Sequence, residues 1–256
     1  MRRPLLWLIA ASLSMALTAL AFCPAAWLGY LVEKQSGGRL TLGDAQGTLW
    51  RGSAFVGASA GKDDPVSPLL PGRFSWRLSP LVLLGQVRLE LDNPSALLQP
   101  VTVDGSWSQW QVGASAVELP AERLSALGAP LNTIQPAGRM VLSWGPLQVT
   151  RARTVLGIEG NMDLALRDIS SRLSPVKPLG AYTLNMVWSG TEAQLLLKTM
   201  NGPMLLSGSG TLANGQLHFS GKAEAALGQE QRLANLLDLL GQRQREGDHD
   251  VFALKL

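Results

Sequence analysis

An uncharged stretch near the N-terminus, from Pro4 to Val32, is the feature that most constrains this chain. It contains no Asp, Glu, Lys, Arg or His, and it is rich in Leu, Ala and Trp. About 20 such residues in a helix cross the hydrocarbon core of a bilayer, so the stretch is long enough for one membrane helix. The sequence therefore predicts a cytoplasmic stub and transmembrane anchor over residues 1–36, followed by an exported domain over residues 37–256.

The charges that flank this stretch predict its orientation. Arg2, Arg3 and the N-terminal amine precede it, and an excess of positive charge favours the cytoplasmic side. A second interpretation is a cleavable signal peptide, because Ala19-Leu20-Ala21 has the small-x-small form that is cut after Ala21. Both interpretations deliver the rest of the chain to the far side of the membrane.

Cys23 is the only cysteine, which excludes a disulfide within the chain and a cysteine-rich zinc site. The preceding residues fit the lipid-attachment box of bacterial lipoproteins poorly, because Phe22 stands where that box needs a small residue. We therefore expect Cys23 to be a buried thiol.

The composition indicates a globular exported domain and argues against nucleic acid as a partner. The chain is 46% hydrophobic, which is enough for a core. It has 22 basic and 19 acidic residues, and leaving out Arg2 and Arg3 makes the balance 20 against 19. So small a net charge predicts no basic face of the kind that binds nucleic acid.

Alternation of apolar and polar residues dominates the exported region and predicts a mainly β, antiparallel domain. A period of two is typical of half-buried strands, and the 27 Gly and 15 Pro supply turns between them. The clearest segments are 74–78, 87–92, 140–144, 162–166, 182–188 and 195–199.

Two short helices are expected within this β pattern. Residues 120–128 begin with proline and end with glycine. The second helix carries a stripe at helical spacing, Leu233, Leu236, Leu237 and Leu240, and ends at Gly241. The stripe is expected to pack on the sheet as a lid, and the alternative is a partner-binding surface.

Each expected helix is followed by a turn-rich stretch and then a strand, ending near residues 144 and 256 respectively. This recurrence suggests two similar halves with a soft boundary near residue 145.

One pattern resembles the nucleophile elbow of serine hydrolases, since Gly57-Ala58-Ser59-Ala60-Gly61 fits G-x-S-x-G. An elbow needs a helix after the serine, and here a polar turn with Asp63 and Asp64 follows. The available bases are His218, in a strand-like segment, and His249, in a polar loop. We do not expect these residues to form a catalytic triad.

The sequence also gives no strong evidence for a metal-binding or a phosphate-binding site. Asp248-His249-Asp250 is the best metal candidate, but adjacent residues on an extended chain point to opposite faces, so a solvated hairpin turn is expected. Gly208-Ser209-Gly210 lacks phosphate-loop spacing and a following helix. The sequence thus predicts no catalytic, cofactor-binding or metal-ligating residue and no cofactor.

Several segments resemble the protein N family of the bacterial type II secretion system, also called general secretion pathway protein N. The strongest is residues 38–54, GRLTLGDAQGTLWRGSA, which resembles the start of the family's exported region. Further similar segments follow in the family's order, at residues 74–78, 83–85, 127–138 and 236–241. With the N-terminal anchor, the resemblance covers essentially the whole chain.

The resemblance implies a single-pass inner-membrane protein of a Gram-negative bacterium with a periplasmic domain. Such a protein is an accessory part of the machinery that moves folded proteins from the periplasm across the outer membrane, and it is not an enzyme. Its expected partners are other inner-membrane subunits of that machinery. The family is also similar to a wider group of periplasmic proteins with long, curved β-sheets, some of which handle lipid.

Two functions of different class therefore remain open. In the first, the chain is a scaffold that docks partners through a strand edge or an apolar patch. In the second, it binds a lipid or another hydrophobic ligand in a groove formed by the apolar faces that carry Phe74, Trp76, Met186 and Trp188.

Overall fold

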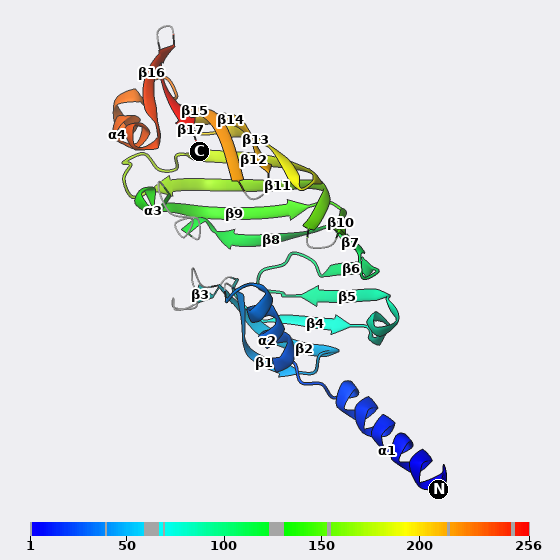
Figure 1. Cartoon of the computed structure of the whole chain (residues 1–256). Helices are drawn as coiled ribbons and strands as arrows, with labels where there is room; N and C mark the ends of the chain where they lie inside the picture. The colour runs from blue at the N-terminus through cyan, green and yellow to red at the C-terminus, as the bar shows by residue number, and fades with distance from the viewer. Residues whose placement is uncertain are drawn as a thin grey trace. The chain divides into compact units, whose positions relative to one another are not determined.

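The chain folds into two compact units of mainly antiparallel β-structure (Figure 1). The computed structural model describes residues 2–38, 40–58, 67–68, 70–122, 131–152, 155–213, 216–246 and 249–255. Unit 1 is Met1–Trp107 and unit 2 is Ser108–Leu256. The mainly β fold class predicted from the sequence is confirmed.

The uncharged N-terminal stretch forms two helices, α1 (Arg2–Ala21) and α2 (Ala26–Gln35). The two helices are separated at Pro24, which cannot donate a helical hydrogen bond. Pro24 instead forms an isolated bridge with Thr48, and the N–H of Ala25 donates to the Gly47 carbonyl at 3.1 Å. Over the described residues, the structure contains no helix that is both long and apolar enough to cross a membrane.

Unit 1 contains a small antiparallel sheet with the strand order β1-β2-β4-β5-β6. A short strand, β3, pairs with the end of β2, and a 3₁₀ turn, η1, joins β4 to β5. The bounds are β1 (Leu40–Gly47), β2 (Arg51–Ala58), β3 (Ser67–Pro68), β4 (Phe74–Leu78), η1 (Pro80–Leu84), β5 (Val87–Asp92) and β6 (Val101–Gly105).

Helix α2 packs against this sheet and closes a small core around Trp76. Ala25 and Ala54 are buried beside the indole ring, whose Nε1 donates to the Leu49 carbonyl at 3.1 Å. Gly52 lies opposite Trp76 on the neighbouring strand, and a Cβ at this glycine would come within 2.5 Å of the indole ring. Trp76 is therefore sealed inside unit 1, which corrects its expected place in an open groove.

Unit 2 is built around a larger sheet with the strand order β8-β9-β11-β12-β13-β14-β15-β17-β16. Figure 1 shows the strand direction turning steadily from β9 to β14. The bounds are β7 (Gln109–Val112), β8 (Ser115–Pro120), α3 (Leu131–Ile134), β9 (Pro136–Trp144), β10 (Leu147–Ala152), β11 (Val155–Ser171), β12 (Gly180–Gly190), β13 (Glu192–Asn201), β14 (Met204–Ala213), β15 (Gln216–Ala225), α4 (Glu230–Leu240), β16 (Gln242–Glu246) and β17 (His249–Lys255).

The longest strand, β11, forms one extended hairpin with β9 and β10. Its second half pairs with β9 and its first half with β10, which also pairs with β7. Gly145 and Pro146 interrupt the first arm of the hairpin, between β9 and β10, inside unit 2.

The predicted strands are confirmed in β4, β5, β9, β11, β12 and β13, and the predicted second helix is confirmed as α4. The outcome differs for the helix expected over residues 120–128. Pro120 ends strand β8, and residues 123–130 lie outside the described part of the chain. Helix α3 and strand β16 were not predicted.

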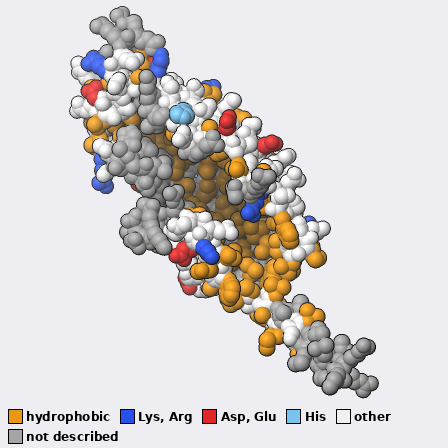
Figure 2. Space-filling view, in the orientation of Figure 1, with side chains coloured by type: hydrophobic (Ala, Val, Ile, Leu, Met, Phe, Trp, Pro, Cys, Tyr) orange, Lys and Arg blue, Asp and Glu red, His pale blue; other side chains and the backbone are white. Residues whose placement is uncertain are grey.

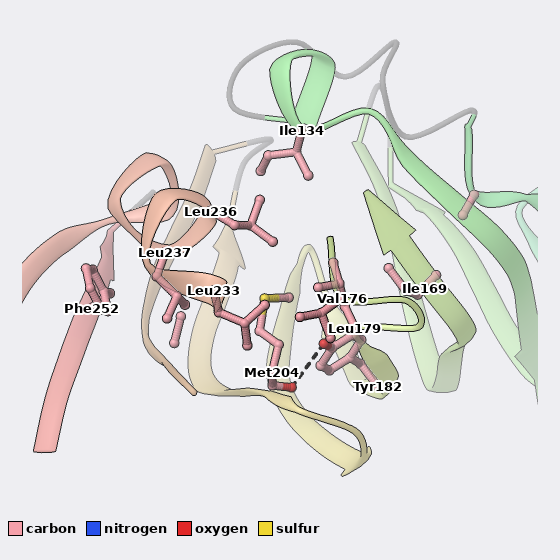
Figure 3. Close-up of a cluster of buried hydrophobic side chains, with 12 residues drawn as sticks. Ile134, Ile169, Val176, Leu179, Tyr182, Met204, Leu233, Leu236, Leu237 and Phe252 are labelled. Atoms are coloured by element: carbon pink, nitrogen blue, oxygen red, sulfur yellow. Dashed lines mark hydrogen bonds between the residues drawn. The ribbon is translucent and has the colours of Figure 1, made fainter. Parts of the chain in front are cut away.

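The leucine stripe of α4 forms the core of unit 2, as the lid interpretation predicted. Leu233, Leu236 and Leu237 are buried against β15 and β17 in one cluster with Met204, Tyr182 and Phe252 (Figure 3). The Tyr182 hydroxyl donates to the Met204 carbonyl at 3.0 Å, and burial raises the pKa of this phenol.

Replacing Leu237 by Ala should lower the free energy of unfolding by about 2–5 kcal/mol, because it leaves a cavity in this core. Leu237 is 2% exposed, whereas Leu239 on the same helix is 50% exposed. Leu239→Ala is therefore a matched control and should change stability by no more than about 0.5 kcal/mol. Urea unfolding followed by circular dichroism measures both, and equal losses would contradict the buried position of Leu237.

Candidate apolar binding face

The sheet of unit 2 has an apolar face, here called the inner face, which is the face that α4 covers at one end. Strand register aligns its side chains in rows that run across the strands, because every second residue points to the same side. One row is Leu142, Leu164, Leu184, Leu197, Gly208 and Gly221. The next is Trp144, Met162, Met186, Leu195, Gly210 and Phe219.

The opposite face, here called the outer face, is polar at the same positions. The row that lies between the two inner rows is Ser143, Asp163, Asn185, Leu196, Ser209 and Ser220. The inner rows consist of half-buried or buried side chains, and four of the six outer-row residues are exposed. An antiparallel sheet with one apolar face needs a cover or an occupant on that face.

Helix α4 covers only part of the inner face. The core cluster beneath it reaches Leu166 and Leu197 but does not include Met186, Leu195 or Trp188 in the rows beyond. Figure 2 shows hydrophobic side chains gathered in a hollow over the strands of unit 2. The inner face is thus closed by α4 at one end and continues past it as an apolar surface.

An aromatic ring lies flat on this surface where β14 and β15 meet. A Cβ added to Gly208, Gly210 or Gly221 would lie 2.6–2.9 Å from the ring atoms of Phe219. Only glycine allows so close an approach between the ring and the backbone. The ring therefore lies against the backbone of these strands, and the inner face has no protruding side chain at the three glycines.

The inner face also holds a buried hydrogen-bond donor, Trp188 Nε1. Among the residues that the structure describes, it has no acceptor. The comparable indole of Trp144 donates to the Gly113 carbonyl at 3.0 Å. A buried donor without a partner is costly, so Trp188 Nε1 is an energetically unfavourable position on the inner face.

The candidate catalytic residues do not assemble a site in the described residues. Ser59, Asp63 and Asp64 lie outside them. His218 lies on the outer face in β15, paired across the strands with Thr211, and lines an open hollow with Ser209 and Ser220.

The candidate metal and phosphate motifs lie in strands. His249 is the first residue of β17 and pairs with Glu246, while Asp248 lies outside the described part. Gly208-Ser209-Gly210 lies within β14. No cluster of three or more potential metal ligands occurs in the described ranges.

The position of Cys23 differs from the buried thiol that the sequence predicted. Cys23 is half-buried at the break between α1 and α2, rather than fully buried. Met186 and Trp188 were predicted from the sequence to lie on an apolar face, whereas Phe219 and the glycines beneath it were not. The alternation of glycine with small polar residues in β14 was the available signal.

The fold defines a class of protein: a mainly β chain whose sheet has one apolar face, partly covered by a helix. Residues 38–251 match the family model of type II secretion system (T2SS), protein N. The chain therefore belongs to the type II secretion system protein N family and is a component of the bacterial envelope. No curated protein and no solved structure matches the chain.

Family membership sets the general function but not the specific role. It implies partners within the secretion machinery, and it is consistent with a structural rather than an enzymatic protein.

Replacing Trp144 by Phe should destabilise unit 2 more than replacing Trp188 by Phe. Both changes remove the same atoms from the inner face, but only the first leaves an acceptor, the Gly113 carbonyl, without its donor. The difference in the free energy of unfolding should be about 1 kcal/mol or more. Chemical denaturation of the two variants measures it, and equal losses would show that Trp188 has an acceptor in the free protein.

Proposed function

We propose that the chain is an accessory, non-enzymatic component of the type II secretion machinery that docks other inner-membrane subunits from the periplasmic side. The observation that carries the proposal is the family match over residues 38–251. The machinery exports folded proteins across the outer membrane, and an accessory subunit contributes by being positioned and by binding partners.

The proposal includes attachment to the inner membrane by a single pass, with the N-terminus in the cytoplasm. It is supported by the uncharged residues of α1, by Arg2 and Arg3 before them, and by the exposure of Trp7, Leu13 and Met15. The uncharged part of α1, from Pro4 to Ala21, rises about 27 Å, slightly less than the roughly 30 Å of the hydrocarbon core.

Secretion should survive removal of the candidate catalytic groups. The triple variant Ser59→Ala, His218→Ala and His249→Ala should secrete folded substrates at the rate of the unmodified chain, since docking does not need these side chains. Secretion is measured in a strain that lacks this protein and needs it. Loss of secretion at normal protein abundance would contradict the scaffold.

Release from the membrane should weaken secretion in the same strain. The fragment 22–256, delivered to the periplasm, keeps α2 and therefore the core around Trp76. It is also the product expected if the chain is cut after Ala21. Without the anchor it loses the high effective concentration that a shared membrane gives. Full rescue of secretion by this fragment would show that attachment to the membrane is not needed for its function.

A second candidate function, binding of a lipid acyl chain, is favoured by the inner face of unit 2. From Leu184 to Trp188 the face extends about 13 Å along the strand. That length is similar to the roughly 15 Å hydrocarbon thickness of one leaflet. The two inner rows carry no charged side chain, as contact with an acyl chain requires.

Two adjacent residues test this second function, because they lie on opposite faces of β12. Met186→Glu places a charge on the inner face and should abolish co-purification of lipid with fragment 22–256, since burying a charge beside an acyl chain is unfavourable. Val187→Glu changes an exposed outer-face residue and should retain the lipid. Native mass spectrometry without detergent measures both, and absence of lipid from the unmodified fragment would reject this function.

A further inference from the structure

We infer that one end of unit 1 is a membrane-contacting surface, and that the surface it contacts is the headgroup region of a phospholipid bilayer. This surface, called here the α1 end, consists of Phe22, Leu81, Leu83, Leu84 and Trp107. The inference rests on the proposed attachment of the chain through α1.

Strand topology brings these residues to the same end of the sheet. In the antiparallel order, β1, β4 and β6 finish where β2 and β5 begin, as the cross-strand pairs Gly47 with Gly52 and Val87 with Gly105 show. The turn η1 and Trp107 directly follow β4 and β6 in the chain. They therefore lie at the same end as the turn between β1 and β2.

Helix α1 terminates at this end and is bonded to it. Trp50, in the turn between β1 and β2, donates from Nε1 to the Leu20 carbonyl in the last turn of α1 at 2.9 Å. The Trp50 carbonyl accepts from the N–H of Leu78, at the end of β4, at 2.8 Å. Trp50 thus links the end of α1 to the strand that leads into η1.

The turn η1 presents leucines to solvent on a fixed backbone. Its first turn is capped by Ser79, whose side chain accepts from the Leu81 N–H, and it ends at Gly85 with a φ of 90°. Leu84 is 79% exposed, and Leu81 and Leu83 are also exposed. Figure 2 shows hydrophobic side chains gathered where α1 leaves unit 1.

Trp107 adds the side chain that bilayer interfaces favour. It is 63% exposed, and its Nε1 donates to the Val82 carbonyl at 2.7 Å, which fixes the indole beside η1. Tryptophan is enriched at membrane interfaces because it is apolar over most of its surface and has one polar edge. A bilayer that holds α1 would reach this surface, since α1 ends at it.

Nearby charges do not dominate this surface. Arg77 and Arg88 lie on the ends of β4 and β5 and pair with Glu90 and Asp104 at 3.7 Å and 3.1 Å, while Arg51 at the start of β2 is exposed. The contact should therefore depend on insertion of apolar side chains more than on anionic lipid.

Spin-label accessibility in vesicles tests the inference with a matched control in the same unit. Full-length protein carrying Cys23→Ser receives a nitroxide label at Leu84→Cys or, separately, at Leu98→Cys. Leu98 is 68% exposed and lies between β5 and β6, at the opposite end of the sheet. Each sample is reconstituted into vesicles of phosphatidylethanolamine and phosphatidylglycerol.

The label at residue 84 should collide more with oxygen and less with a water-soluble nickel chelate than the label at residue 98. Lowering the phosphatidylglycerol content should leave this difference unchanged. Equal accessibility of the two labels would overturn the inference. Flotation of the vesicles after carbonate washing reports attachment separately, so failure to float would reject the anchor, while flotation with equal accessibility would reject only the membrane-contacting surface.

Discussion

The register of β11 with its neighbours is the constraint on which unit 2 depends. This strand of 17 residues pairs with β12 along one edge and with β9 and β10 along the other, so it decides which side chains of four strands face α4. A slip of one residue would move Met162 and Leu164 to the outer face and bring Asp163 inward. The apolar face of these strands therefore follows from one set of backbone hydrogen bonds.

Much of this architecture was predictable because alternation is a local signal. The segments around Trp76, Leu164 and Met186 carry the period of a half-buried strand, and α4 carries its leucines at helical spacing. Alternation does not say what covers the apolar side, however. Trp76 and Met186 look alike in sequence, yet the first is sealed by α2 and the second lies beyond the lid of unit 2.

Other features depend on contacts between distant residues. The apolar stretch continues past Pro24, so hydropathy alone does not predict the break between α1 and α2. The break is stabilised by hydrogen bonds to the turn between β1 and β2, some 20 residues later in the chain. The close approach of the Phe219 ring to the backbone likewise requires glycines on two strands in register. The family segment 38–54 gains a physical explanation from these contacts, because Gly47 and Gly52 form the ends of the turn and Trp50 bonds to α1.

The break at Pro24 also determines how far unit 1 could move from a membrane that holds α1. Helix α2 packs on the sheet, and Pro24 and Ala25 are bonded to the end of β1, so only Phe22 and Cys23 remain as a linker, and two residues span at most about 7 Å. The hydrogen bond from Trp50 to Leu20 shortens that reach further. If α1 is anchored as proposed, unit 1 would stay close to the bilayer instead of moving as a domain on a long tether. Partners would have to meet it near the bilayer surface, which suits a part of an assembly whose other subunits are held in the same membrane.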